Sequence, residues 1–373
     1  MSLKCGDIID VVKKLAPENL QEKWDNSGLN VGDRETSVKK ILFALDAVDS
    51  VIDEAIENDV DMIITHHPML LFVDLKNITT DSEVGRRIYK LIRNNISLYC
   101  AHTSLDVAYG GTNDVLSNLI ELSDIEILQE TKAEKVFKVA TYVPFDSVDN
   151  VRKAMGDSGC GHIGNYSHCT FSSEGKGQFK PLEGTNPYIG ETGVIETVNE
   201  IKIETVVNEK NLSKVIKVIN DSHPYEEPAI DIMPMEIKGE KQGIGRIGNI
   251  KPEMTFIEFS KFVKNKLGLD SMRITGDENK IVKRCALCTG AGTDFFNIAK
   301  SKGADVYITG DVKFHEAQKA LSMGLCLIDG THYATENIAV PVMAEYVKNA
   351  VENKGEKVEI IISKFNGQTF KNI

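Results

Sequence analysis

The first third of the chain alternates short apolar runs with stretches whose apolar residues recur at helical spacing. The apolar runs are Ile41–Leu45, Met62–Ile64 and Ile96–Ala101, and runs of this kind are typical of strands covered on both faces. Helices are expected between them, over 48–58 and 81–94. Because strands that alternate with helices build parallel sheets, the pattern predicts a mostly parallel sheet flanked by helices.

The same pattern returns in the last third of the chain. A helix is expected over 252–267, and three strand-like runs follow at 281–288, 306–309 and 326–329. Each of these runs is followed by a glycine turn and a helical pattern, and a last strand is expected over 358–362. The two outer thirds therefore belong to the same α/β fold class.

The middle of the chain follows a different order. Strands over 138–143 and 200–207 are each followed by a helix, with a glycine-rich stretch between these two pairs. The order strand–helix–strand–strand–helix–strand resembles a ferredoxin-like fold. The sequence thus predicts an α+β domain inserted into a discontinuous α/β domain. The predicted bounds are 132–236 for the insert and 1–131 with 237–373 for the α/β domain.

Histidines and carboxylates follow three of the predicted strands, at the point where each strand ends. His66 and His67 come after the second apolar run, and His102 with Asp106 after the third. His332 and Glu336 follow the strand at 326–329. In open α/β sheets the loops beyond the carboxyl ends of the strands meet and form binding sites. We therefore expect these six side chains to lie together.

Four imidazoles and two carboxylates form a mixed nitrogen and oxygen ligand set. Such a set suits zinc first, with iron(II) or manganese as alternatives, and it offers enough donors for two divalent ions with positions left open for water. Asp106 or Glu336 could bridge the ions. Each piece alone has a plain alternative, because a histidine pair in a loop or a polar pair at i, i+4 on a helix surface is common. Three such pieces at three strand ends favour the metal site.

The composition limits the classes of function. With 43 basic and 55 acidic residues the formal charge is −12, which argues against a nucleic-acid-binding surface as the main role. The sequence shows neither a signal-peptide core nor a run of about 20 apolar residues that could cross a membrane. Its seven cysteines are scattered, as expected for reduced thiols. We therefore expect a soluble, cytoplasmic protein.

Four further motifs have alternative interpretations. Gly243–Gly248 matches a dinucleotide-binding fingerprint by letter, but without a preceding strand an extended, closely packed segment is expected. Cys285 and Cys288 lie in an apolar run and are expected to be buried structural thiols. The glycine turn Thr289–Asp294 could hold an anion or be an ordinary strand-to-helix turn. His315 could relay protons near the metals or lie on the surface.

The motifs as a set resemble one protein family, the NGG-interacting-factor-three-like family, whose bacterial members are often labelled GTP cyclohydrolase I type 2 homologs. The segments that carry the resemblance are Trp24–Leu29 (WDNSGL), Thr65–Pro68 (THHP), Ala101–Asp106 (AHTSLD) and Gly330–Glu336 (GTHYATE). The insert, with Gly164–Tyr166 and His223–Ala229, resembles the nitrogen-regulator-like or copper-tolerance-like domain of longer bacterial members. The resemblance implies that the six residues bind two metal ions and that the chain forms a toroidal homohexamer.

Two functional hypotheses follow from these observations. The first is a metal-dependent hydrolase that acts on a nucleotide or another small phosphorylated or heterocyclic substrate, as the family label implies. The second is a non-catalytic metal-binding or metallochaperone-like assembly, in which the insert senses a ligand. Both bind metal, so turnover separates them.

Overall fold

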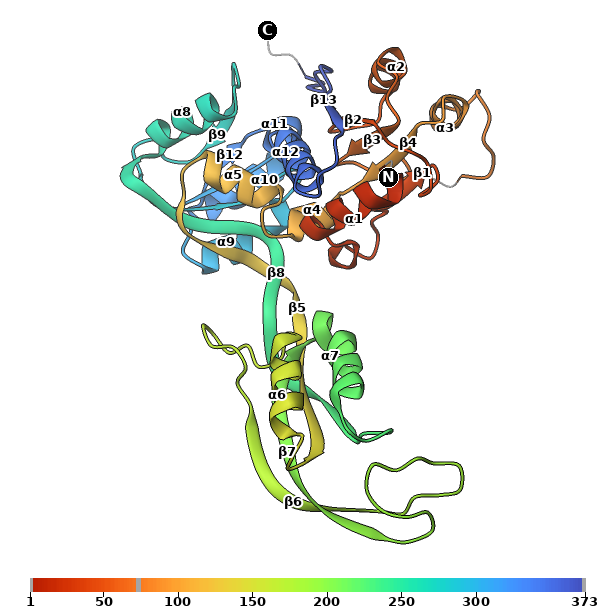
Figure 1. Ribbon diagram of the computed structural model, residues 1–373. Helices are drawn as coiled ribbons and strands as arrows, with labels where there is room; N and C mark the ends of the chain where they lie inside the picture. Colours follow the sequence, from red (N-terminus) through yellow and green to blue (C-terminus); the bar gives the residue numbers. More distant parts are fainter. Residues whose placement is uncertain (1–2, 72–74, 371–373) are drawn as a thin grey trace. The chain divides into compact units, whose positions relative to one another are not determined.

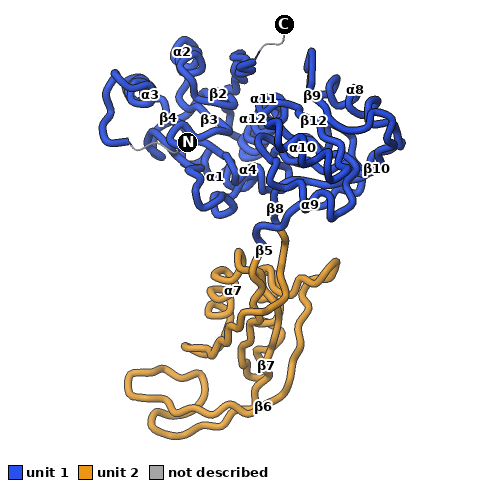
Figure 2. The backbone as a smooth tube through the Cα atoms, turned by 180° about the vertical axis from the view of Figure 1, so that it is seen from behind, with its two compact units in different colours: residues 1–132, 242–373 blue, residues 133–241 orange. Residues whose placement is uncertain are grey.

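The structure is a computed structural model that describes residues 3–71 and 75–370. It has a mixed α/β fold with two sheets flanked by helices, which confirms the predicted α/β class (Figure 1). The chain divides into two compact units, residues 1–132 with 242–373 and residues 133–241 (Figure 2). The sequence placed the second boundary at 236/237. This boundary and the one at 241/242 both fall within one long strand, β8 (Ile230–Thr255).

The first sheet of unit 1 holds the two strands of the N-terminal third that candidate histidines follow. Its order is β1-β4-β3-β2-β13, in which β1 is antiparallel to β4 and the other neighbours are parallel. The strands are β1 (Gly28–Val31), β2 (Lys40–Ala44), β3 (Met62–Thr65), β4 (Ser97–Cys100) and β13 (Glu359–Ile362).

Both faces of this sheet are covered, as its apolar strands predict. Ile41 and Phe43 pack with the cluster that includes α1 (Cys5–Leu15) and α12 (Ala339–Glu352). Leu42 lies between them in sequence and packs on the other face, with α2 (Asp49–Glu57) and α3 (Glu83–Arg93). Alternate residues of a strand point to opposite faces, so a strand buried on both faces must be apolar throughout.

The second sheet contributes its carboxyl-terminal strands to unit 1. Here β10 (Ile281–Leu287), β11 (Val306–Thr309) and β12 (Cys326–Asp329) are parallel neighbours. β8 and β9 (Arg273–Thr275) flank them and run antiparallel. The prediction of a mostly parallel sheet therefore describes only part of this sheet. Apolar periodicity does not reveal strand direction, which explains the difference.

Helices and two 3₁₀ turns complete unit 1. α5 (Thr112–Leu119) and α8 (Phe256–Lys266) pack on one face of the second sheet, and α9 (Phe296–Ser301) and α10 (Phe314–Ser322) on the other. The remaining elements are α4 (Thr103–Val107), α11 (His332–Asn337), and the 3₁₀ turns η1 (Glu18–Leu20) and η2 (Thr293–Phe295). Among the described residues, none of the helices combines the length and the apolar character needed to span a bilayer.

One predicted helix start is wrong. The helix expected from Pro252 begins at Phe256 instead, because Thr255 caps it: the Thr255 hydroxyl accepts a hydrogen bond from the Glu258 backbone, and Glu258 accepts one from the Thr255 backbone. Residues up to Thr255 remain in β8.

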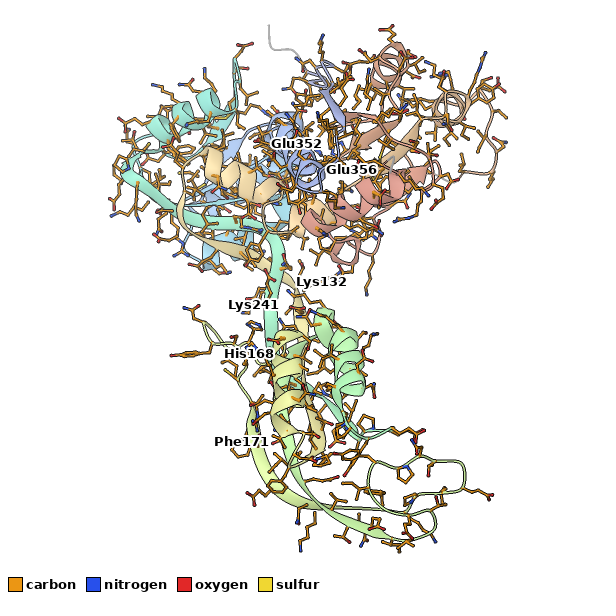
Figure 3. All side chains as sticks on the ribbon, in the orientation of Figure 1. Lys132, His168, Phe171, Lys241, Glu352 and Glu356 are labelled. Atoms are coloured by element: carbon orange, nitrogen blue, oxygen red, sulfur yellow. The ribbon has the colours of Figure 1, made fainter. Side chains whose placement is uncertain are left out.

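Unit 2 has the element order strand–helix–strand–strand–helix–strand. β7 (Glu196–Asn208) lies between β5 (Ser123–Pro144) and β6 (Phe171–Phe179) and is antiparallel to both. α6 (Val148–Asp157) and α7 (Glu209–Ser222) pack together on the cluster that contains Val139 and Ile203. Figure 3 shows Phe171 at the start of β6, where its ring is largely exposed to solvent.

Candidate metal centre

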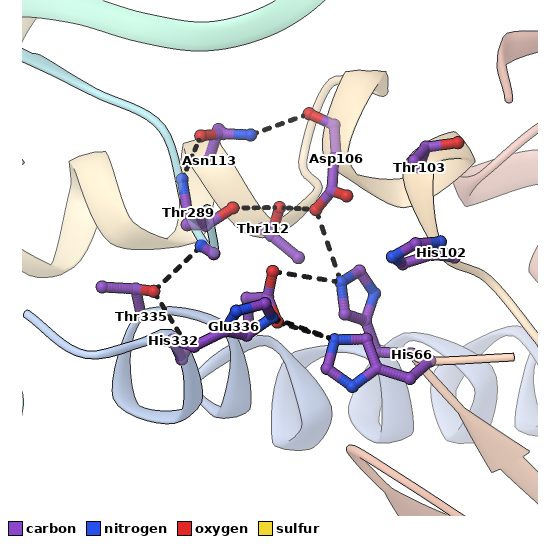
Figure 4. Close-up of polar contacts among 12 residues, drawn as sticks. His66, His102, Thr103, Asp106, Thr112, Asn113, Thr289, His332, Thr335 and Glu336 are labelled. Carbon is purple, nitrogen blue, oxygen red and sulfur yellow. Dashed lines mark hydrogen bonds and ion pairs between the residues drawn. The ribbon is translucent and has the colours of Figure 1, made fainter. Parts of the chain in front are cut away.

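The six predicted ligands lie together within unit 1, at the place where loops from both sheets meet. His66 and His67 directly follow β3, while His102 precedes α4, the helix that holds Asp106. The short helix α11 carries His332 and Glu336 and follows β12 of the second sheet. Their ligand atoms form three overlapping groups within 4.8 Å (Figure 4). The groups are His66, His67 and His102; His67, His332 and Glu336; and His66, Asp106 and Glu336.

Glu336 lies at the centre of the cluster, and its two oxygens face different histidines. Oε2 is 2.9 Å from Nε2 of His67 and 3.0 Å from Nε2 of His332. Oε1 is 3.7 Å from Nε2 of His66, which in turn is 3.5 Å from Oδ1 of Asp106. The spacing of four between His332 and Glu336 puts both on one face of α11, as the sequence predicts.

Each of the four imidazoles forms a hydrogen bond through Nδ1 to an acceptor outside the set of six candidate ligands. The Nδ1 atoms lie 2.7 or 2.8 Å from an acceptor, and these pairs are His66 with the Ala101 carbonyl, His67 with Asp46, His102 with Asp25 and His332 with Asp311. A hydrogen bond from Nδ1–H to an acceptor fixes the tautomer and leaves the Nε2 lone pair free. Histidines that bind metal ions are held in the same way in most proteins.

The arrangement of Nε2 atoms fits a cation. Nε2 of His66 is fully buried and has no hydrogen-bond partner among the described residues. Nε2 of His67 and Nε2 of His332 are 3.4 Å apart, so two lone pairs would face each other if both rings were neutral. A proton or a metal ion between these atoms removes the conflict. A buried polar atom without a partner costs about 1–3 kcal/mol, so the unpaired Nε2 of His66 also favours a bound ion.

The electrostatics of the cluster also favour positive charge. Burial lowers the pKa of His67, but Asp46 and Glu336 outweigh it and raise that pKa to about 10. Burial also lowers the pKa of His332, but the carboxylates of Glu336 and Asp311 outweigh burial and raise that pKa to about 9. Burial raises the pKa of Glu336, yet the surrounding histidines hold it well below its usual value. The site therefore attracts cations.

Asp106 is supported by the first two residues of α5. The Thr112 hydroxyl donates to Oδ1 of Asp106 at 2.5 Å, and the Asn113 side chain donates to its backbone carbonyl at 2.9 Å. Asn113 also accepts a hydrogen bond from the backbone N–H of Thr289. These contacts hold the carboxylate toward His66.

The glycine turn after β10 contacts the cluster. Gly290 has a φ of +63°, and a methyl group at its Cα would lie 2.1 Å from Oε1 of Glu336. Its backbone N–H donates to Thr335 in α11. The sequence left open an anion site or an ordinary turn here, and the structure shows a turn packed closely against the candidate metal ligands.

The other motifs are resolved by burial and contacts. His315 is exposed on α10 and pairs with Gln318 of the same helix, so the structure places it on the surface and does not support the proton-relay alternative. Gly243–Gly248 lies within β8, which confirms the extended interpretation. Cys285 and Cys288 are buried, and burial raises the pKa of both thiols, as expected for structural cysteines.

Sequence reasoning missed the outer carboxylates. Asp46 and Asp311 each lie two residues past the end of a strand, β2 and β11, next to the strand whose loop carries the histidine they bind. Asp25 lies in the WDNSGL segment, and besides His102 it accepts hydrogen bonds from the backbone and the hydroxyl of Thr103. Once the strand pairing is known, an acidic residue beyond the end of the neighbouring parallel strand points to the first two.

The fold and the cluster together define a mixed α/β protein with a candidate metal centre between loops of two sheets. The chain belongs to the Duf34/NIF3 (NGG1p interacting factor 3) family, whose model matches residues 3–368. This confirms the resemblance seen in the sequence motifs.

Similar proteins match over nearly the full length. The chain is 44% identical to a Bacillus subtilis protein named GTP cyclohydrolase 1 type 2 homolog, over 99% of this chain and 98% of that protein. It is 40% identical to a Bacillus cereus protein related to NIF3, whose crystal structure matches with a TM-score of 0.91 over 99% of both chains. A Staphylococcus aureus protein is 30% identical, with a TM-score of 0.79 over 100% of this chain and 99% of that one.

Proposed function

We propose that this protein holds two divalent metal ions in the cluster and acts as a metal-dependent hydrolase on a nucleotide or another small phosphorylated or heterocyclic substrate. The observation that carries the proposal is the orientation of the four imidazoles, each held at Nδ1 so that Nε2 is left to bind an ion, in a cluster that also includes two carboxylates. The name GTP cyclohydrolase 1 type 2 homolog, given to relatives, supports nucleotides as the first substrates to test.

The overlap of the three ligand groups supports two ions rather than one. His66, His67 and Glu336 each belong to two of the groups, whereas His102, Asp106 and His332 each belong to one. The two oxygens of Glu336 face different histidines, so this carboxylate is the best candidate for a bridge between the ions. Zinc suits this set of ligands best, and iron(II) or manganese are the alternatives.

The residues of the chain have separable tasks in this proposal. Bound divalent ions would lower the pKa of a water molecule and polarise an oxygen of the substrate. Asp25, Asp46 and Asp311 orient the imidazoles and balance the charge of the ions, while Thr112 keeps Asp106 in place. None of these four groups needs to touch the substrate.

A non-catalytic metal-binding or metallochaperone-like role is the second candidate, and burial favours it. His66, Asp106 and Glu336 are 1%, 8% and 4% exposed, so one of the three ligand groups is closed to solvent. An ion held there would exchange slowly and offer little access to a substrate. His67, His102 and His332 are only partly buried, so an ion beside them would be open to a substrate, as the hydrolase proposal requires.

The test combines metal counting with turnover. Purified protein loaded with zinc, iron(II) or manganese is analysed for metal content and assayed against GTP, other nucleotides and small phosphoesters. We expect two ions per chain and hydrolysis that is lost in His67→Ala and Glu336→Ala but kept in His315→Ala, a matched histidine outside the cluster. Two bound ions without turnover would refute the hydrolase and support the non-catalytic metal-binding role. Turnover that survives both substitutions would refute the hydrolase, and a metal-free protein would refute both.

Three further properties are proposed with this function. The family resemblance suggests a toroidal homohexamer, and light scattering that shows a smaller assembly would contradict it. The element order of the insert suggests a ferredoxin-like fold. The seven free cysteines suit a cytoplasmic location, which fractionation of cells would test.

A further inference from the structure

A second site candidate lies entirely within unit 2, in a cavity of about 820 Å³. The hairpin of β6 and β7 forms one wall, segment 181–188 forms another, and segment 225–229 closes the end. Ligand sites for small molecules usually measure about 300–1,000 Å³, so the cavity has the size of such a site. It shares no residue with the candidate metal centre.

Aromatic side chains line this cavity around Tyr225. The ring of Tyr225 lies 5.7 Å from that of Phe179 and 6.3 Å from that of Tyr188, measured between centroids. Its other neighbour is the buried His223, whose ring lies 5.0 Å away and whose Nδ1 accepts the backbone N–H of Tyr225. This hydrogen bond fixes the segment that carries the tyrosine, so the aromatic surface is formed before any ligand binds.

A buried carboxylate lies in the same cavity. Glu200 is 6% exposed, and its Oε1 accepts the hydroxyl of Tyr225 at 2.7 Å. Oε2 accepts no hydrogen bond from the described residues. A methyl group on Gly177 would lie 2.2 Å from Oε2, so the carboxylate can take this position only because residue 177 has no side chain. The accepting capacity of Oε2 is therefore left for a donor from outside the chain.

The other charged groups around the cavity are mostly acidic. Glu200 is joined by four more glutamates, and only two lysines balance them: Glu174, Glu183, Glu226, Glu227, Lys176 and Lys202. Lys202 is engaged by Glu204 at 2.8 Å. An anionic ligand would therefore be repelled, while a cation would be attracted.

We propose that this cavity binds a small organic cation that has N–H donors and a flat or apolar body. Ionised carboxylates can only accept hydrogen bonds, so Oε2 of Glu200 would accept one from an N–H group of the ligand. The faces of tyrosine and phenylalanine rings attract cations and stack on flat groups. An amidinium or amine attached to a ring meets both conditions. The proposal does not depend on the metal centre.

Three compounds of nearly equal shape test the charge requirement: benzamidine, a cation; benzamide, neutral; and benzoate, an anion. Binding to the full chain is measured by isothermal titration calorimetry. We expect saturable binding of benzamidine, at least about tenfold tighter than benzamide, because both can donate an N–H group to Glu200 but only benzamidine adds an attraction between opposite charges. Benzoate should not bind. Equal affinities for benzamidine and benzamide, or no saturable binding of benzamidine, would overturn the proposal.

Two glycines on β6 offer a matched pair of variants. Gly177→Ala places a methyl group on Oε2 of Glu200, whereas Gly175→Ala has nothing within 4 Å of the added carbon. We expect Gly177→Ala and Glu200→Gln to weaken benzamidine binding about tenfold or more, and Gly175→Ala to change it less than twofold. Glu200→Gln keeps the acceptor for Tyr225, so the fold is retained. Unchanged binding in Glu200→Gln would refute the assignment of the carboxylate.

Discussion

Metal binding to this cluster should depend steeply on pH, since protons and metal ions compete for the same imidazoles. The raised pKa values of His67, about 10, and His332, about 9, mean that both rings hold protons at neutral pH when no metal is present. A metal ion binds only the neutral ring, so it must displace these protons. The affinity for the metal ion is therefore low below the raised pKa values and grows as pH rises toward them.

The size of the effect follows from the number of protons displaced. Each displaced proton adds about one decade of affinity per pH unit below its pKa. Nε2 of His67 and Nε2 of His332 face the same oxygen of Glu336, so an ion beside that oxygen displaces the proton of one ring or of both. We therefore expect the affinity for zinc to rise by about one to two decades per unit between pH 7 and pH 9, and to level off above about pH 10.

Competition with a chromophoric chelator at pH 7, 8 and 9 measures this slope, and calorimetry in two buffers of different ionisation enthalpy counts the released protons. Asp46→Asn removes the negative charge behind His67 but keeps an acceptor, so it should flatten the slope and weaken zinc binding about tenfold to a hundredfold at pH 9. Asp53→Asn, whose carboxylate pairs with Lys90, is the matched control. Affinity that stays constant between pH 7 and pH 9 would refute the reasoning.

Two further predictions concern a glycine beside the cluster and a buried ion pair of unit 1. Gly290→Ala should abolish most metal binding, because its methyl group collides with Glu336. Gly268→Ala, at a similar positive φ but with nothing within 4 Å of the added carbon, should lose only stability. Equal metal content in the two variants would contradict this prediction. Asp114→Ala should lower the free energy of unfolding by about 3 kcal/mol, because it leaves the buried guanidinium of Arg246 without its carboxylate. Urea denaturation measures this free energy, and a loss below about 1 kcal/mol would count against the prediction.

The candidate ligands could be predicted from the sequence because each follows an apolar strand, and strand ends of this kind converge in α/β folds. The positions of His66, His102 and His332 relative to their strands agree with that reasoning. The partition into two sheets could not be predicted, since apolar runs carry no information about which strands pair. The start of α8 differs from the prediction because the capping box of Thr255 and Glu258 sets it, not Pro252.

The outer contacts could not be predicted for a different reason. Asp46 is one of many acidic residues in loops, and its distance of 2.7 Å from His67 depends on the parallel pairing of β2 with β3. The same holds for Asp311, which reaches His332 because β11 pairs with β12. A contact that depends on strand pairing becomes visible only when the register of the sheet is known.

The same pairing explains why two adjacent histidines can serve one site. β3 lies between β2 and β4 in the sheet, and all three strands are parallel. His66 leans toward the end of β4, where the Ala101 carbonyl accepts its Nδ1–H, while His67 leans toward the end of β2, where Asp46 does the same. The rings are anchored on opposite sides and still lie 5.1 Å apart, with both Nε2 atoms directed at Glu336. A histidine pair placed after an edge strand would lack one of these two anchors, so the central position of β3 is what lets both rings face one candidate site.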